Sequence, residues 1–287
     1  MPMLCLAGRC AVTSTEPDGD SIRFIPDDPA DWDRVPGAHR VRVNALGGAQ
    51  LRLDAIDALE THYAARGGPT LHQPLPLAHA AAGELLRWLG FRDVVRDAER
   101  VTAVRADGLP AYLLTRTADT YGRCVALLGR GDPPAPSGER IIVTRAMLRR
   151  TANHRLITTG LAYPTFYSLL YADLRTELVK QTTRARTDRR GVFADDLTQT
   201  GVEITRLPTL TTEAVILPKL FRRLVEYLHL NDDDPSLAGF TAFLEQHDDR
   251  LYIIPTADRT GLDTVVDVNG QTVKLNRLPE ELIFDEA

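Results

Sequence analysis

The stretch QLRLDAIDALET, residues 50–61, joins a strand pattern to several charged side chains. Residues 50–56 alternate between apolar and polar, which is typical of a strand with one buried face, and they place Arg52 on the polar side. Asp57 and Glu60 then follow where the chain leaves this strand. We therefore expect a half-buried strand that delivers a guanidinium and two carboxylates to one end of a sheet.

The sequence around this stretch predicts more strands and three helices. Helical spacing of leucines predicts the first helix, which Gly90 would end. The expected strands are 4–13, 21–25, 40–44, 50–56, 100–106, 111–116 and 123–128, and the expected helices are 75–89, 144–158 and 166–186. Five or so strands with a helix after the third predict an α+β domain over residues 1–196, a five-stranded β-barrel of the oligonucleotide/oligosaccharide-binding (OB) type with three helices.

The pattern restarts in residues 197–287, here called the C-terminal extension. It predicts helices at 212–230 and 236–247, a strand at 251–254, and a hairpin at 265–275 that turns on Asn269-Gly270. We expect an α+β extension whose apolar helix packs on the barrel or on a partner chain.

Composition and charge indicate a globular protein without disulfides or membrane spans and with an uneven distribution of charge. The chain has 287 residues, 44% of them hydrophobic and 25% charged, which is typical of a globular protein. Its net charge of −5 is uneven, because residues 1–199 hold 26 Lys and Arg against 23 Asp and Glu, whereas residues 200–287 hold 8 against 16. Three scattered cysteines predict no disulfide framework. The absence of a long apolar run or of a secretory signal pattern predicts a cytoplasmic protein with no membrane partner.

Two further motifs accompany residues 52–61. One is the turn Asp18-Gly19-Asp20-Ser21 between the first two strands, and the other is Asp119-Thr120-Tyr121-Gly122-Arg123 between the last two. In this order and at this spacing they resemble the staphylococcal nuclease (thermonuclease) family. The resemblance covers residues from about 10 to 196. It extends to Gly160-Leu161-Ala162 and Gly191-Val192-Phe193.

The residue types suit the hydrolysis of a phosphodiester. The reaction builds negative charge on the phosphate oxygens, which two guanidiniums, Arg52 and Arg123, can hold through paired hydrogen bonds. Asp20 and Asp57 offer hard oxygen ligands for a divalent ion, and calcium tolerates looser geometry than magnesium does. Glu60 is placed to orient or deprotonate an attacking water.

The resemblance implies the remaining roles. The carbonyl of Ala58 would complete a calcium site formed with Asp20, Asp57 and Glu60. Asp119 would hold a side chain of the site in place without contacting the ion itself. The family's stacking tyrosines do not align cleanly with this sequence, and its aromatic side chains fit a stacking role and the core equally well. The candidates for substrate binding are Thr120, Tyr121, Tyr163, Phe166 and Tyr167.

Two further positions depart from the family pattern. Leu59 stands where the family has a proline, which leaves the backbone after Asp57 less restrained, and Thr120 stands where it often has a lysine. Neither change affects the proposed catalytic residues and aspartate ligands, so we expect retained catalysis with an altered substrate preference. These residues are Asp20, Arg52, Asp57, Glu60 and Arg123.

The sequence thus predicts a calcium-dependent nuclease acting on DNA, RNA or both, preferably single-stranded, and leaving 3′-phosphates. The alternatives are an inactive nuclease-like barrel that only binds nucleic acid or protein, and an unrelated barrel with chance motifs. The acidic C-terminal extension would restrain substrate access, cap the barrel, or mediate binding to a second copy or another protein.

Overall fold

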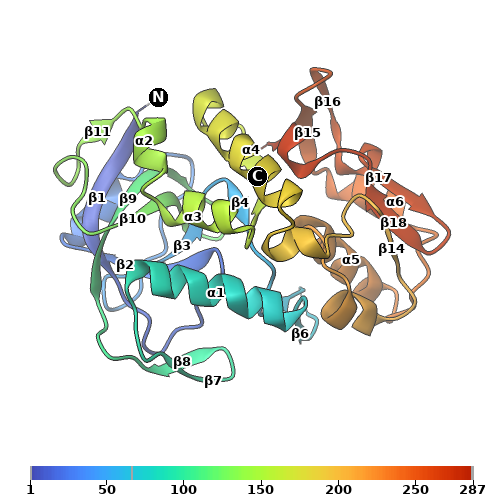
Figure 1. Ribbon diagram of the computed structural model, residues 1–287, viewed down its shortest axis with the longest axis horizontal. Coiled ribbons are helices and arrows are strands. Elements are labelled where there is room, and N and C mark those ends of the chain that lie inside the picture. The colour runs from blue at the N-terminus through green and yellow to red at the C-terminus, as the bar shows by residue number, and fades with distance from the viewer. Residues whose placement is uncertain (1, 66, 286–287) are drawn as a thin grey trace.

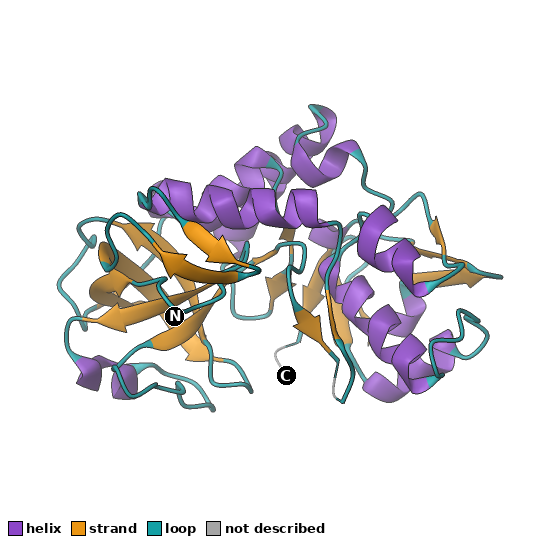
Figure 2. Ribbon diagram, turned by 90° about the horizontal axis from the view of Figure 1, so that it is seen from below, coloured by secondary structure: helices purple, strands orange, loops and turns teal. Residues whose placement is uncertain are grey.

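The computed structural model describes residues 2–65 and 67–285, with a β-barrel at one side and the C-terminal extension at the other (Figure 1). Helices α1 (Leu75–Leu89), α3 (Ala152–Thr159) and α4 (Ala172–Thr187) lie across the barrel and reach toward the C-terminal extension (Figure 2). The short helix α2 (Arg145–Leu148) precedes α3.

Five strands form a closed mixed barrel. They are β1 (Met3–Cys10), β2 (Ser21–Pro26), β3 (Ala49–Leu53), β9 (Leu109–Ala118) and β10 (Cys124–Arg130). Their order is β1-β2-β3-β10-β9, and antiparallel pairing of β9 with β1 closes the ring, while β3 and β10 pair in parallel. The short β11 (Arg140–Ile141) extends the sheet beside the first residues of β1. The predicted α+β class with a five-stranded barrel is confirmed.

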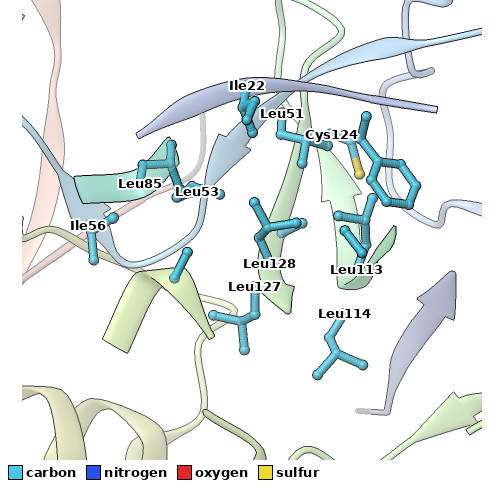
Figure 3. Packing of buried hydrophobic residues seen from close by; sticks show 14 of the residues in the cluster. Ile22, Leu51, Leu53, Ile56, Leu85, Leu113, Leu114, Cys124, Leu127 and Leu128 are labelled. Carbon is cyan, nitrogen blue, oxygen red and sulfur yellow. The ribbon is translucent and has the colours of Figure 1, made fainter. Parts of the chain in front are cut away.

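The barrel interior is filled by apolar side chains that alternate along the strands. Leu51 and Leu53 of β3 are fully buried together with Ile22 and Leu128, and Leu85 of α1 packs against them (Figure 3). Helix α1 covers the end of this core, and its observed bounds equal the predicted ones. Proline begins it and Gly90, with a φ of 107°, ends it in the left-handed conformation.

Short elements lie between the barrel strands and after the last of them. They are η1 (Pro29–Arg34), β4 (Ile56–Asp57), β5 (Tyr63–Ala64), β6 (Thr70–Leu71), β7 (Val95–Asp97), β8 (Arg100–Ala103), β12 (Tyr163–Pro164), β13 (Phe166–Tyr167) and η2 (Gly191–Ala194). Of these, β4 pairs antiparallel with β12, so the chain that leaves β3 lies beside the segment that precedes α4.

Four predicted elements of the barrel region differ from the structure. Residues 40–44 form no strand beyond a single bridge at Val43, and 100–106 belongs to the hairpin of β7 and β8 outside the barrel. The helix expected at 144–158 is two helices, because the Thr151 hydroxyl accepts a backbone hydrogen bond that starts α3 anew. The helix expected at 166–186 begins only at α4, because 166–167 is a strand that pairs with β19.

Over residues 197–285, the C-terminal extension contains two α-helices and two small sheets. Its elements are β14 (Val202–Glu203), the π-helical turn η3 (Thr209–Glu213), α5 (Pro218–Leu230), α6 (Phe240–His247), β15 (Arg250–Ile253), β16 (Asp258–Gly261), η4 (Leu262–Thr264), β17 (Val266–Asn269), β18 (Thr272–Leu275), η5 (Pro279–Glu281) and β19 (Leu282–Phe284). The hairpin on Asn269-Gly270 is confirmed. The helix expected at 212–230 starts at Pro218 instead, since proline donates no hydrogen bond and favours the first turn.

A second apolar core joins the C-terminal extension to the rest of the chain. Its members from the extension include Phe221 and Leu224 of α5, and its members from before residue 197 include Leu59, Tyr163 and Phe193. Strand β13 pairs in parallel with β19, so one strand from residues 1–196 belongs to a sheet of the extension. The extension is therefore built against the residues that follow β3.

None of the described helices is both long enough and apolar enough to span a bilayer.

Candidate functional site

The register of the barrel brings the three motifs to one end. Ser21, directly after the Asp18-Gly19-Asp20 turn, pairs with Arg52. On the other side of β3, Arg52 pairs with Val125, two residues after Arg123. The backbone of Asp20 also accepts a hydrogen bond from the Leu53 N–H at 2.8 Å. Residues far apart in sequence thus lie around the end of β3.

The first turn is held tightly against the chain that follows β4. A Cβ on Gly19 would lie 2.4 Å from the Ala58 Cβ, so only glycine fits there. The Asp18 carboxylate accepts the Asp20 and Ser21 N–H groups at 3.0 and 2.7 Å and fixes the turn. The Asp20 carboxylate accepts the Ala58 N–H at 3.1 Å. Burial, followed by repulsion from Asp18, Asp57 and Glu60, raises the pKa of Asp20 well above its usual value.

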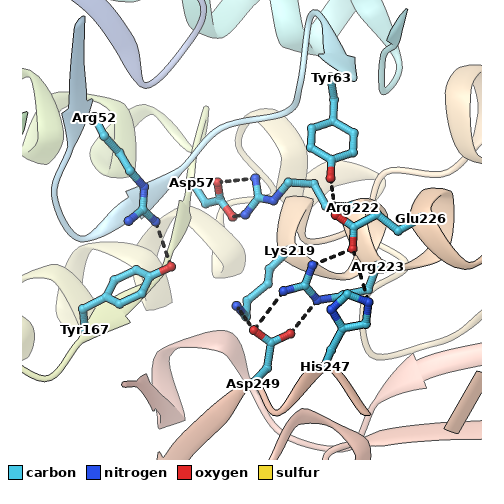
Figure 4. Close-up of polar contacts among 10 residues, drawn as sticks. All are labelled: Arg52, Asp57, Tyr63, Tyr167, Lys219, Arg222, Arg223, Glu226, His247 and Asp249. Carbon is cyan, nitrogen blue, oxygen red and sulfur yellow. Dashed lines mark hydrogen bonds and ion pairs between the residues drawn. The ribbon is translucent and has the colours of Figure 1, made fainter. Parts of the chain in front are cut away.

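Asp57 is bound by an arginine from the C-terminal extension. Its carboxylate is 3% exposed and accepts two hydrogen bonds from Arg222 of α5, at 2.8 Å to Oδ2 and 3.1 Å to Oδ1 (Figure 4). This paired geometry is the strong form of an ion pair between guanidinium and carboxylate. Burial acts to lower the pKa of Arg222, but Asp57 and Glu60 hold it well above the usual value, so this guanidinium is charged at all working pH values.

Glu60 contacts the same guanidinium. Arg222 Nη1 donates to Glu60 Oε1 at 2.6 Å. Burial is the main reason that the pKa of Glu60 is raised to about 7, with Asp18 and Asp57 adding repulsion and Arg222 opposing them. A carboxyl with this pKa is half ionised at neutral pH, the condition that favours general acid–base chemistry.

A fully buried glutamine fixes the backbone of Glu60. The Gln73 side chain accepts the Glu60 N–H at 3.2 Å, and the Gln73 N–H donates to the Glu60 carbonyl at 2.9 Å. The Gln73 amide also donates to the carbonyl of Ile216 at 2.8 Å. Gln73 therefore links the Glu60 segment to the C-terminal extension.

Arg52 is positioned by Tyr167. Its Nη2 donates to the Tyr167 hydroxyl at 2.9 Å, and its guanidinium carbon lies 4.5 Å from the centre of the tyrosine ring. Burial acts to lower the pKa of Arg52, but the Tyr167 hydroxyl, Asp57 and Asp20 raise it above the usual value. Tyr167, predicted as a stacking residue, thus contacts a predicted catalytic residue.

Arg123 is positioned by its own turn. Asp119 accepts the Arg123 Nε–H at 2.7 Å and the backbone N–H groups of Tyr121 and Arg123 at 3.1 and 2.9 Å. Asp119 binds only the Nε–H of the guanidinium. The two terminal amino groups of Arg123 donate to no side chain or backbone group in residues 2–65 and 67–285. Thr120 is exposed, and Tyr121 is 77% exposed with its ring 5.6 Å from the Arg123 guanidinium.

Two predicted stacking residues lie in the cores. Tyr163 has no exposed surface, and its hydroxyl donates to Asp196 at 2.9 Å; Phe166 is also fully buried. A base stacks only on an exposed ring, so neither side chain serves this role in the present arrangement. Tyr121 is the exposed aromatic side chain of the site.

The predicted calcium ligands do not fit a divalent ion in this arrangement. Asp57 and Glu60 are bound to the Arg222 guanidinium, and the Asp20 carboxylate accepts the Ala58 N–H. In the part of the chain that the structure describes, no group of three or more His, Cys, Asp or Glu side chains has a geometry that could hold a metal ion. The positive charge next to these carboxylates comes from the chain itself.

Sequence reasoning missed Arg222 and Gln73. The available signal for Arg222 was the Arg222-Arg223 pair on an amphipathic helix, which a solvated helix face explains equally well. Gln73 carried no signal, since a single glutamine in a loop is common.

Comparison with protein-family models found no match to this chain. A search of curated proteins found no match either.

Proposed function

We propose that this protein hydrolyses phosphodiester bonds in nucleic acid. The observation that carries the proposal is the convergence of the three motifs at one end of the barrel. Arg52 lies on β3, Arg123 directly precedes β10, which pairs with β3, and Glu60 follows on the chain that leaves β3. Family-like residues scattered over the barrel would not support this reading.

Each of these residues suits one part of the reaction. Arg123 keeps two terminal amino groups for phosphate oxygens while Asp119 fixes its direction. Arg52, held by Tyr167, supplies a second permanent positive charge. Glu60, with a pKa of about 7, accepts the proton of the attacking water near neutral pH.

The substrate class follows from the barrel and its charges. A closed five-stranded barrel with a helix between β3 and β9 is consistent with the OB type, whose members often bind oligonucleotides. The exposed ring of Tyr121 beside Arg123 offers a stacking surface that tolerates any base. We propose single-stranded DNA or RNA as substrate, 3′-phosphate products and a cytoplasmic location. Calcium is proposed as the activating ion on the resemblance alone, and it would bind Asp57 and Glu60 only after Arg222 had left them.

A binding module without catalysis is the second candidate. The contact of Arg222 with Asp57 and Glu60 favours it, because a guanidinium bound to both carboxylates neutralises part of the charge that a nuclease of this kind would use. In that case Arg52, Arg123 and Tyr121 would still bind a nucleic-acid backbone.

Cleavage of labelled single- and double-stranded DNA and RNA tests the proposal. Wild type would be compared with Glu60→Gln and Arg123→Ala in calcium, magnesium or chelator. We expect cleavage by wild type and a loss of at least about 100-fold in each variant, because each removes a group that acts in the transition state.

Arg130→Ala is the matched control. Arg130 ends β10, the strand that begins beside Arg123, and contacts Trp88 rather than the site. Wild-type activity in this variant would show that losing one arginine from the barrel has no general effect. Tight binding without cleavage under every metal condition would reject the nuclease and favour the binding module.

A further inference from the structure

Arg222 is fixed to the C-terminal extension by the helix that carries it. Helix α5 buries Leu220, Phe221 and Leu224 in the second core, and the arginine extends from this anchored helix toward β4. Its side chain is 22% exposed, whereas those of Asp57 and Glu60 are 3% and 15% exposed. The guanidinium therefore lies between two largely buried carboxylates and retains some contact with solvent.

Further contacts hold α5 against the same part of the chain. The Tyr63 hydroxyl, three residues after Glu60, donates to Glu226 at 2.5 Å. Arg223, the next residue on α5, donates to Asp249 and to Glu226. Figure 4 shows Arg222 bonded to Asp57, and Arg223 bonded to Asp249 in a separate cluster. The two neighbouring arginines thus serve different partners.

The contacts of Arg222 use the groups that a divalent cation would need. Both oxygens of Asp57 and one oxygen of Glu60 accept hydrogen bonds from it. These carboxylates carry the negative charge that attracts a hard cation, and one guanidinium already neutralises part of it. A cation placed on them would also be repelled by Arg222 at short range, in a site that water screens poorly.

We propose that Arg222 is an internal competitor for divalent cations at Asp57 and Glu60. The C-terminal extension keeps Arg222 bound to the two carboxylates, and a cation binds them only when Arg222 moves away. The proposal rests on the proposed function for the importance of these carboxylates, but it concerns cation binding and not cleavage.

Calcium titration without substrate tests the proposal. Isothermal titration calorimetry with calcium chloride would compare full-length wild type, Arg222→Gln and Arg223→Gln. We expect Arg222→Gln to bind calcium at least about tenfold more tightly than wild type, because it removes the competing charge. Arg223→Gln removes an equally anchored guanidinium from the same helix, so it should bind calcium as wild type does. Equal or weaker binding by Arg222→Gln would overturn the proposal.

A second variant covers the case in which Arg222→Gln fails to fold. Arg222→Lys keeps a positive charge beside Asp57 but loses the paired hydrogen bonds of the guanidinium. We expect its calcium affinity to rise by about threefold or more. An affinity equal to that of wild type would contradict competition by Arg222.

The outcome is separable from that of the nuclease test. Tighter calcium binding by the Arg222 variants in a protein that cleaves nothing would support the competition and reject the nuclease. Cleavage by wild type, with calcium affinity unchanged in the variants, would support the nuclease and reject the competition.

Discussion

The carboxyl of Glu60 has one positive and two negative neighbours. Burial raises its pKa most, Arg222 lowers it, and Asp18 and Asp57 raise it further, with a net value of about 7. The ordinary value for this side chain is 4.5, so the folded protein keeps a proton that the unfolded chain has already lost at pH 6. This difference has a consequence for stability.

We expect Glu60 to destabilise the protein as pH rises from 4.5 to 7. The folded state binds more protons in this range, so the free energy of unfolding falls with increasing pH and stays reduced above pH 7. The full effect for a pKa of about 7 is up to about 3 kcal/mol. Urea unfolding of wild type and Glu60→Gln at pH 4.5, 6 and 8 measures it, with the exposed Glu203→Gln as control. A stability difference between wild type and Glu60→Gln that is the same at all three pH values would contradict the assignment.

At the scale of elements, the turn between β9 and β10 sets the direction of Arg123. Gly122 has a φ of 81°, and a Cβ there would lie 2.7 Å from the Arg42 Cβ. The backbone carbonyl of Asp119 accepts the Gly122 N–H and closes the turn, and the Asp119 carboxylate accepts the Arg123 Nε–H and so orients Arg123. A glycine is therefore needed for both backbone conformation and space.

Gly122→Ala should lower both stability and cleavage. The positive φ costs about 1 kcal/mol for alanine, and the clash with Arg42 adds to it by shifting the turn and with it Arg123. We expect cleavage to fall at least about tenfold. Gly131→Ala is the matched control, because Gly131 has a φ of 72° with no atom near its Cβ position and follows the other end of β10. Thermal unfolding and cleavage assays on both variants separate strain from displacement of Arg123; equal cleavage in the two would contradict this role of the turn.

Local sequence signals predicted the elements that depend on local contacts. Helix α1 was predicted with its true ends because Gly90 and the leucine spacing act within the helix itself. The start of α4 was wrong because Phe166 pairs with Ile283, a contact that no local pattern encodes. The same distinction applies to the site. The motifs around Asp20, Arg52 and Arg123 are local, whereas the bond from Arg222 to Asp57 spans 165 residues and could not be predicted.

At the scale of the whole molecule, the C-terminal extension is part of one folded structure with the barrel region. The second core takes Leu59, Tyr163 and Phe193 from residues before 197. The predicted boundary falls directly after Asp196, which forms a β-bridge with Val215 of the C-terminal extension. Cutting the chain there would expose apolar side chains and leave Asp57 without Arg222.

We expect residues 1–196 alone to be much less stable than the full chain. Exposing several fully buried side chains removes about 1.5–3 kcal/mol for each large one, and an unpaired Asp57 adds a further penalty. Circular dichroism melting of the truncated and full-length proteins measures the effect. Arg222→Gln serves as control, since it removes the ion pair and leaves the second core in place. An unchanged melting temperature after truncation would show that residues 1–196 fold independently.

The pairing of β13 with β19 also sets an order of events during protein synthesis. All five barrel strands lie within residues 3–130, so they leave the ribosome long before the partner of Phe166, 117 residues later in the chain. At translation rates of about 5–20 residues per second, this delay is on the order of ten seconds. Until α5 is synthesised, within the same interval, Asp57 and Glu60 have no Arg222 to bind. Maturation therefore ends when α5 and β19 dock, and this final step places the guanidinium on carboxylates that were synthesised first.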